Sequence, residues 1–352
     1  MSKVYFFHEY GAPSHVYGLE YLLNKYDIKL EHREFNYSGQ FFFLARQIKH
    51  LRFNFTKRFC QNIGFLLSLL FTKDRKIVLG IAPYNYYLKW LRYFFKRHKV
   101  YYFTSYTCWD QTRMANSQHY SPKVLNIWKK FIHDEVKHIF TVSDLAHKEL
   151  VKNGFNKSEN ISIVYHSYIE NIEASTAVEK NNNFLYVGRL VESKGIEELL
   201  NIFSTLPHCS LTIVGRGYLD SKVQEATKLY TNIHYKGYIE GLENIIPIYK
   251  ENSFLLLNSQ RTETWEELFG ISLVEGMACG LIPIATNHPG PTEIITSEKD
   301  GILCKEGSIK EAIEYVLKMS DDEFFLMKQN AIIRGQEFRS SEISHRWEAI
   351  LE

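Results

Sequence analysis

The 352-residue sequence predicts an α/β protein made of two doubly wound domains. Short apolar runs alternate with segments whose apolar residues recur at helical spacing, as in parallel strands joined by helices. The length exceeds that of one ordinary domain. Residues 170–183 are polar and lack periodicity, which is typical of a linker between two domains.

The first half of the chain opens with an apolar run at residues 3–8, a glycine turn at Gly11 and a helical pattern. This order of strand, glycine loop and helix is how a doubly wound domain begins. Ser143 stands where it can cap the helix that follows a strand. Further strands of this half are predicted at residues 76–81, 100–104, 138–142 and 161–164.

The second half repeats the alternation, with strands predicted at residues 184–187, 211–214, 233–235 and 254–257 and in the run LIPIAT. A helix is expected to begin near Ile271. The segment HPGP after LIPIAT predicts a turn, because proline and glycine favour turns. The tail, residues 320–352, shows two helical patterns that are predicted to break at Gly335.

Two glutamates flank the helix expected at Ile271. Glu267 precedes it and Glu275 lies about one turn inside it, while Gly270 allows a tight entry. The first turn of a helix has unpaired N–H groups and a positive dipole end, so it can bind a phosphate. The alternative is a surface helix with two solvated glutamates.

Two cations, Arg189 and Lys194, bracket a turn at the carboxyl end of a predicted strand. Ligands of open α/β sheets bind at this end. Arginine can grip a diphosphate as a fork, and lysine contributes a point charge. The alternative is a pair of solvated surface cations.

These motifs together resemble the retaining glycosyltransferases of family 4. The resemblance rests on Gly188-Arg189…Lys194-Gly195, on Glu267-x7-Glu275 with the following GMACG, and on Glu293, and it covers roughly residues 137–318. It implies the GT-B fold: two Rossmann-like domains that face a cleft, with a C-terminal helix that crosses back to the first domain. The implied domains are an N-terminal acceptor-binding domain at 1–168, joined by a helix at about 336–352, and a C-terminal nucleotide-sugar-binding domain at 184–335.

The resemblance also implies roles for single residues. Glu267 would contact the donor sugar and act in catalysis with Arg189 and Lys194, and Glu275 would bind the ribose. The implied nucleotide-sugar site comprises Gly188, Arg189, Lys194, Gly215, Tyr238, Ile239, Glu267, Phe269, Gly270, Ile271, Ser272 and Glu275. The family usually has Pro-Ser shortly before the first glutamate, whereas this chain has NSQRTETWEE.

The acceptor side is less well marked. The family often has a histidine after the strand equivalent to residues 100–104, and this chain has TSYTCWDQ there. The paired glycines of the first loop are also absent. The acceptor-side candidates are Gly11, Ser105, Tyr106 and Asp110.

The implied reaction is transfer of a hexose, with retention, from a nucleotide-diphosphate sugar to a saccharide that is lipid-linked. A UDP-sugar is favoured and a GDP-sugar is possible. We expect no cofactor and no metal, since no Asp-x-Asp is present to hold a metal–diphosphate complex. The alternatives are a non-catalytic partner subunit of the same fold and an epimerase-like enzyme.

Charge is unevenly distributed. Residues 1–109 contain 17 Lys and Arg against 6 Asp and Glu, and residues 41–55 predict a basic amphipathic helix. Its apolar residues are Leu44, Ile48, Leu51 and Phe55, and its cations are Arg46, Lys49 and Arg52. This pattern predicts a cytoplasmic protein that rests on the anionic inner face of the membrane and builds a surface polysaccharide, without a nucleic-acid partner. An ordinary helix packed on the sheet is the alternative.

The five cysteines show no CxxC pair and no spacing typical of a metal site. We therefore expect reduced thiols.

Overall fold

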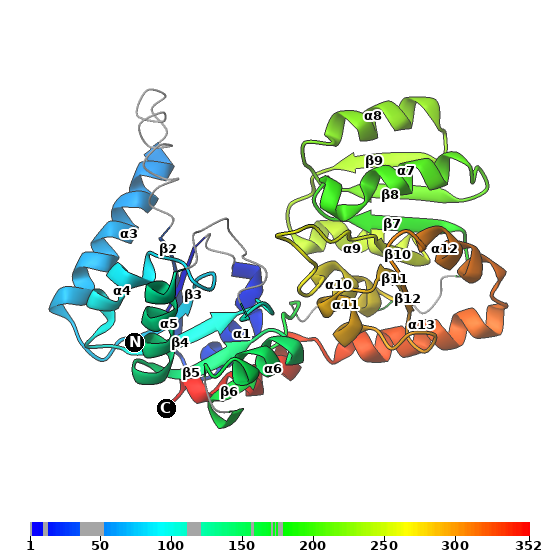
Figure 1. Cartoon of the computed structure of the whole chain (residues 1–352). Coiled ribbons are helices and arrows are strands. Elements are labelled where there is room, and N and C mark those ends of the chain that lie inside the picture. Colours follow the sequence, from blue (N-terminus) through cyan, green and yellow to red (C-terminus); the bar gives the residue numbers. More distant parts are fainter. Residues whose placement is uncertain are drawn as a thin grey trace. The chain divides into compact units, whose positions relative to one another are not determined.

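The computed structural model describes residues 2–9, 13–35, 53–110, 121–155, 158–169, 172, 174 and 179–352 (Figure 1). The chain forms two compact units. The first contains Met1–His166 and Ile343–Glu352, and the second contains Ser167–Glu342. The last ten residues of the chain thus join the first unit.

The first unit is built on a six-stranded sheet in which every pairing is parallel, with the strand order β2-β1-β3-β4-β5-β6. Its strands are β1 (Lys3–His8), β2 (Lys29–Glu34), β3 (Lys76–Gly80), β4 (Lys99–Thr104), β5 (Val136–Thr141) and β6 (Ile161–Ile163). Its longer helices are α1 (Tyr17–Lys25), α3 (Phe53–Phe71), α4 (Leu88–Phe95), α5 (Pro122–Asp134) and α6 (Asp144–Lys152).

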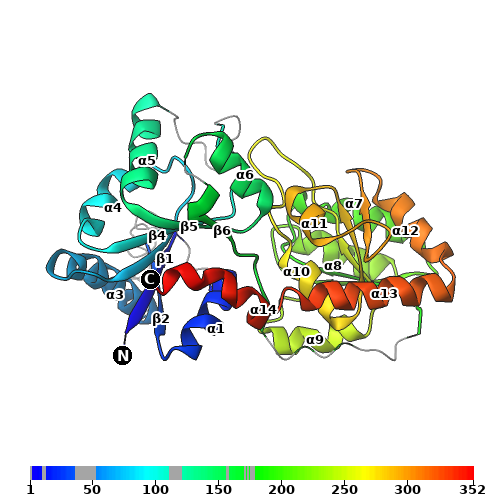
Figure 2. The same cartoon turned by 90° about the horizontal axis from the view of Figure 1, so that it is seen from below.

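Both faces of this sheet are covered. On one face, Phe7 and Tyr102 pack in a core to which α3–α6 contribute apolar residues. On the other face, Trp347 lies with its ring centroid 4.5 Å from that of Phe140. The 3₁₀ helix His345–Ile350, which follows α14 (Ser340–Ser344), lies beside α1 (Figure 2). The predicted return of the C-terminal helix to the first domain is confirmed.

The second unit has a parallel six-stranded sheet of order β12-β11-β10-β7-β8-β9. Its strands are β7 (Asn183–Val187), β8 (Ser210–Val214), β9 (Ile233–Gly237), β10 (Phe254–Leu257), β11 (Ile282–Thr286) and β12 (Ile302–Cys304). Its helices are α7 (Ile196–Ser204), α8 (Asp220–Leu229), α9 (Leu242–Lys250), α10 (Ile271–Cys279), α11 (Pro289–Ile294), α12 (Ile309–Lys318) and α13 (Asp321–Gln336). Two doubly wound α/β units are therefore present, as the sequence predicts.

Helix α10 is tightly packed in the second unit. A Cβ on Gly276 would lie 2.6 Å from Leu255 Cδ2, so α10 lies closely against β10. A Cβ on Gly335 would lie 2.6 Å from the backbone N of Ala278, so α13 approaches the backbone of α10. These close approaches hold α10 between the sheet and α13, and with it the turn at Gly270.

Two local predictions are wrong. HPGP is not a turn: His288 precedes α11, and Pro289 occupies its first position, where a missing N–H costs nothing. Gly335 does not break the tail, because α13 runs through it to Gln336 and needs a glycine there to approach α10.

Strand β2 and helix α5 were not predicted at all, although Ser121 caps α5 by accepting a 3.3 Å hydrogen bond from Val124 N. The predicted helix at residues 41–55 falls outside the described residues up to residue 52, and Gly11 falls outside them as well.

Candidate functional site

The carboxyl end of the second sheet is where the predicted site residues gather. Strand β8 lies on one side of β7 and β10 on the other, so the strand order reverses next to β7. Such a switch point is where open α/β sheets bind ligands. Lys194 follows β7, Ser259 follows β10, and Glu267 lies on the loop between β10 and α10.

Glu267 and Lys194 form a buried ion pair. The Lys194 ammonium contacts Glu267 Oε2, and each residue is only 9% exposed. The Ser259 hydroxyl donates a 3.0 Å hydrogen bond to the same carboxylate oxygen. Removal of one partner of a buried pair leaves an uncompensated charge, which costs about 3–5 kcal/mol. The structure thus joins two residues that the sequence had only assigned separately.

His288 fixes the backbone on both sides of this pair. Its Nδ1 accepts a hydrogen bond of 3.1 Å from Glu267 N, and its Nε2 lies 2.9 Å from the Ser259 carbonyl oxygen. Because an amide N–H only donates and a carbonyl oxygen only accepts, the imidazole is neutral with its proton on Nε2. Burial lowers the pKa of His288, which is consistent with this state. We did not predict His288, since HPGP signals only local chain geometry.

The polar lead-in before Glu267 covers the ion pair. The Trp265 ring lies 4.7 Å from the Lys194 ammonium, which is a cation–π distance. Arg261 anchors the same loop through Glu306 Oε1 at 2.8 Å and the Asn287 carbonyl at 2.7 Å. The segment NSQRTETWEE, which this chain has where the family usually has Pro-Ser, therefore places the Trp265 ring against Lys194.

The start of α10 has the geometry of an anion site. Gly270 has a φ of 98°, in the left-handed region that favours glycine. The first turn contains no acidic residue, and Ser272 is buried. A Cβ on Gly290 would lie 2.2 Å from Phe269 N, so α11 closes directly on the Phe269 backbone. Helix, turn and supporting glycine thus lie together in an arrangement that could bind a phosphate.

Glu275 is half-buried on α10, and the buried Tyr249 hydroxyl donates a 3.0 Å hydrogen bond to its carboxylate. Burial raises the Glu275 pKa to about 7, although the Tyr249 hydrogen bond opposes that rise. At neutral pH this carboxyl group therefore exists in both protonation states.

The remaining donor-side residues lie at the ends of β7, β8 and β9. A Cβ on Gly215 would lie 1.8 Å from the Gly188 carbonyl oxygen, so these two turns are in contact. Tyr238 is exposed beneath the Arg216 guanidinium at 4.3 Å, and Ile239 is half-buried beside it. Arg189 is exposed, and within the described residues its guanidinium makes no hydrogen bond or ion pair.

The acceptor-side candidates follow β4 in the first unit. Ser105 and Tyr106 are half-buried and Asp110 is exposed. The Trp109 indole N–H donates a 2.9 Å hydrogen bond to the Tyr106 carbonyl, which fixes this stretch.

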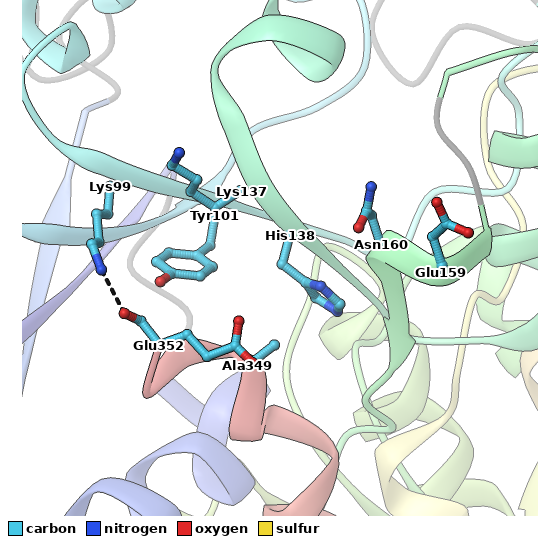
Figure 3. A pocket seen from close by; sticks show the side chains of 8 residues that line it. All are labelled: Lys99, Tyr101, Lys137, His138, Glu159, Asn160, Ala349 and Glu352. Carbon is cyan, nitrogen blue, oxygen red and sulfur yellow. Dashed lines mark hydrogen bonds between the residues drawn. The ribbon is translucent and has the colours of Figure 1, made fainter.

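A cavity of about 430 Å³ lies elsewhere in the first unit (Figure 3). Its walls include Lys99, Lys137 and His138, which begin β4 and β5, so it opens at the amino end of the sheet. The Lys99 ammonium donates a hydrogen bond to the Glu352 carbonyl there. None of the predicted site residues lines this cavity, and ligands of open sheets bind at the opposite end.

Comparison with solved structures identifies the fold as GT-B. HepE of Anabaena, solved in complex with UDP-glucose, superposes with a TM-score of 0.67 at 14% identity, covering 100% of this chain and 99% of that one. The lipopolysaccharide outer core galactosyltransferase WaaB gives a TM-score of 0.61 at 16% identity, with 100% and 99% coverage.

Sequence comparison identifies the family. Residues 168–338 match the family described as glycosyl transferases group 1, so this segment, about half of the chain, is a group 1 glycosyltransferase domain. CapM of Staphylococcus aureus, a capsular polysaccharide biosynthesis glycosyltransferase, is 25% identical over 201 residues. That match covers 54% of this chain and 52% of CapM, so the similarity spans about half of such relatives.

The raised Glu275 pKa predicts a pH-dependent effect of Glu275→Gln on stability. The unfolded chain releases this proton near pH 4.5 and the folded chain only near 7, so the wild type loses stability as pH rises through this interval. The variant has no such loss. Its unfolding free energy relative to wild type should rise by about 1–2 kcal/mol between pH 5 and pH 8 in urea titrations. The exposed Glu225→Gln is the control, and parallel pH profiles for Glu275→Gln and wild type would contradict the assignment.

Proposed function

We propose that this protein transfers a hexose, with retention, from a nucleotide-diphosphate sugar to a saccharide acceptor. The observation that supports this most is the Lys194–Glu267 pair at the switch point of the second sheet, beside the first turn of α10. A sugar diphosphate can use each of these groups. The cation and the amino end of the helix suit the phosphates, and the carboxylate can accept a hydrogen bond from a sugar hydroxyl.

The chemical task is departure of a diphosphate from the anomeric carbon. Lys194, Arg189 and the N–H groups of α10 stabilise the negative charge that develops on it. The Lys194 ammonium has three N–H groups, so it can contact Glu267 and a phosphate oxygen together. The described side-chain hydrogen bonds of Glu267 use Oε2, and we assign Oε1 to a sugar hydroxyl. Glu275 binds the ribose. The acceptor hydroxyl attacks the anomeric carbon from the side of the leaving group as the bond to the diphosphate breaks, and a phosphate oxygen of the leaving group takes the hydroxyl proton.

UDP is the favoured nucleotide and GDP the second choice, and we place the reaction in the synthesis of a surface polysaccharide on a lipid-linked acceptor. HepE binds UDP-glucose, and CapM is named for capsule biosynthesis. Both support the proposal by similarity.

We further propose that the first unit rests on the inner face of the cytoplasmic membrane. No helix in the described part of the chain is long and apolar enough to span a bilayer. The neighbouring helices α3 and α4 instead expose large apolar side chains, with Phe71 84% and Trp90 56% exposed. The Lys89 ammonium lies 5.0 Å from the Trp90 ring. Exposed aromatics among cations are typical of a surface that enters the headgroup region of anionic lipid.

The donor site is tested by UDP calorimetry and by UDP release from a panel of UDP-sugars. Arg189→Ala should weaken UDP binding by roughly 1.5–3 kcal/mol, because one charge-assisted contact is lost. Arg189 is a better probe than Lys194, whose removal would leave the Glu267 carboxylate buried without its cation. Glu267→Gln should retain UDP binding but lose sugar transfer, since its partner is the sugar.

The controls are Lys222→Ala, which removes an exposed cation of the same unit, and Glu263→Gln, which alters an exposed carboxylate of the loop that holds Glu267. Unchanged UDP affinity in Arg189→Ala would remove the phosphate site from this edge. UDP binding without release of UDP from any sugar donor would favour a non-catalytic partner subunit. Recovery of a nucleotide sugar whose sugar has been altered would favour an epimerase-like enzyme.

Membrane binding is tested by cosedimentation with vesicles. Phe71→Glu should weaken binding to vesicles that contain phosphatidylglycerol by about tenfold, because the burial of a phenyl ring is lost. Binding should also fall with salt. Leu229→Glu, at a position 67% exposed on α8 of the second unit, is the control. Equal recovery of wild type on neutral and anionic vesicles would refute an electrostatic membrane surface.

A further inference from the structure

The side chain of Tyr249 connects helix α9 to the donor-site helix α10, which lies beside it (Figure 1). Tyr249 is completely buried near the end of α9. A Cβ on Gly276 would lie 3.4 Å from Tyr249 Cε1, so the phenol ring packs directly on the backbone of α10. The Tyr249 hydroxyl donates a 3.0 Å hydrogen bond to Glu275 Oε2. The carboxyl group of Glu275 is therefore held from outside its own helix.

The turn that ends α9 fixes Tyr249 in turn. Asn252 N donates a 3.1 Å hydrogen bond to the Tyr249 carbonyl oxygen, and Asn252 Nδ2 donates one of 2.7 Å to the Ile248 carbonyl oxygen. Asn252 is itself buried. The phenol is thus held in position by its own helix end, independently of Glu275.

The two carboxyl oxygens of Glu275 have different surroundings. Oε2 accepts the hydrogen bond from Tyr249, and a buried phenol O–H needs such an acceptor. Within the described residues Oε1 accepts no hydrogen bond, and it is not buried, so it reaches solvent. The better acceptor of a protonated carboxyl group is its carbonyl oxygen. Tyr249 therefore places the proton of protonated Glu275 on Oε1, the oxygen that faces solvent.

Glu275 changes its charge near neutral pH. Burial raises its pKa to about 7, and the Tyr249 hydrogen bond opposes that rise, so this bond favours the ionised form. Burial also raises the pKa of Tyr249, and it raises that of Cys279 to about 12, so neither neighbour titrates in this range. Lys250 of α9 acts on Cys279, and Arg334 of α13 donates to two carbonyl oxygens of α11. Strands β10 and β11, which also pack on α10, contain no titratable residue.

We propose that Tyr249 is a positioning residue of the donor site, whose hydroxyl occupies Glu275 Oε2 and so presents Oε1, in its ionised form, to a ribose hydroxyl of the nucleotide. A hydroxyl donates a stronger hydrogen bond to a carboxylate than to a neutral acceptor. A proton on Oε1 would replace this acceptor with a donor. Tyr249 thus acts on the ribose through Glu275 without touching it.

This role couples nucleotide binding to a proton. The ribose hydrogen bond favours the ionised form of Glu275, so a protonated Glu275 releases its Oε1 proton to solvent when the nucleotide binds. The role of Tyr249 rests on the proposed function, which places the ribose at Glu275.

The test compares UDP with 2′,3′-dideoxy-UDP by calorimetry at pH 6, 7 and 8. Both nucleotides have the same diphosphate, so the ratio of their dissociation constants reports the ribose hydroxyls and cancels the ionisation of the phosphates. In the wild type, the preference for UDP should rise by about fivefold from pH 6 to pH 8 as Glu275 ionises. Tyr249→Phe should reduce this preference by about threefold at pH 7 and move its rise to higher pH, because the bond that favours the ionised form is lost.

The matched control is Tyr315→Phe, which alters an exposed tyrosine on α12 and should behave as wild type does. Glu275→Gln should show a preference that does not change with pH. Should Tyr249→Phe not fold, proton release by the wild type carries the test. At pH 7, in buffers of different ionisation enthalpy, UDP should release about half a proton more than 2′,3′-dideoxy-UDP does.

A role of Tyr249 in packing alone would weaken both nucleotides equally. The same preference and pH dependence in Tyr249→Phe as in wild type, or equal proton release with the two nucleotides, would therefore overturn the positioning role. Either result with UDP still bound leaves the donor site intact. Wild type that does not bind UDP would instead remove the donor site, and the role of Tyr249 with it.

Discussion

The buried ion pair between Lys194 and Glu267 is the interaction on which the carboxyl edge of the second unit depends. Two charges that are each 9% exposed are stable only with close partners, and Ser259 and Trp265 complete their surroundings. His288, in a single neutral tautomer, ties the backbone of Glu267 to that of Ser259. The loop between β10 and α10 is thereby held in place before any ligand arrives. A preorganised charge arrangement of this kind is what departure of a diphosphate requires.

The two sheets differ in the charge of the side chains at the place where their strand order reverses. Each sheet is parallel, and in each the strand order reverses beside its first strand. In the second unit this place contains the Lys194 cation and the Glu267 carboxylate, which are complementary to the phosphates and to the hydroxyls of a sugar diphosphate. In the first unit it contains the imidazoles of His8 and His15, whose pKa values are lowered by burial. The same backbone geometry thus places charged groups at this edge in one unit and neutral imidazoles in the other.

Much of the fold was predictable because local rules agree with the tertiary structure. Ser143 caps α6 by accepting a 3.1 Å hydrogen bond from Ala146 N, and α10 begins at Ile271 after a left-handed glycine. Where local rules failed, packing decided the outcome. Gly335 resembles a helix breaker in the sequence, yet it allows α13 to approach the backbone of α10.

The site was predictable only in part. The motifs gave Lys194 and Glu267, but their contact joins positions 73 residues apart and follows from the sheet order. His288 has no spacing in the sequence that relates it to Glu267 or Ser259, because the fold alone brings these residues together. Glu275 was expected to be a ribose ligand, and its pKa of about 7 depends on burial that no motif reveals.

A crystal structure of the protein with bound UDP tests the central claim most directly. The account predicts the diphosphate at the first turn of α10, with phosphate oxygens within hydrogen-bond distance of Lys194 Nζ and the Arg189 guanidinium, while Lys194 keeps its contact with Glu267. The ribose hydroxyls should lie against the Glu275 carboxylate. UDP bound away from the β7–β10 edge, with the Lys194–Glu267 pair untouched, would contradict it.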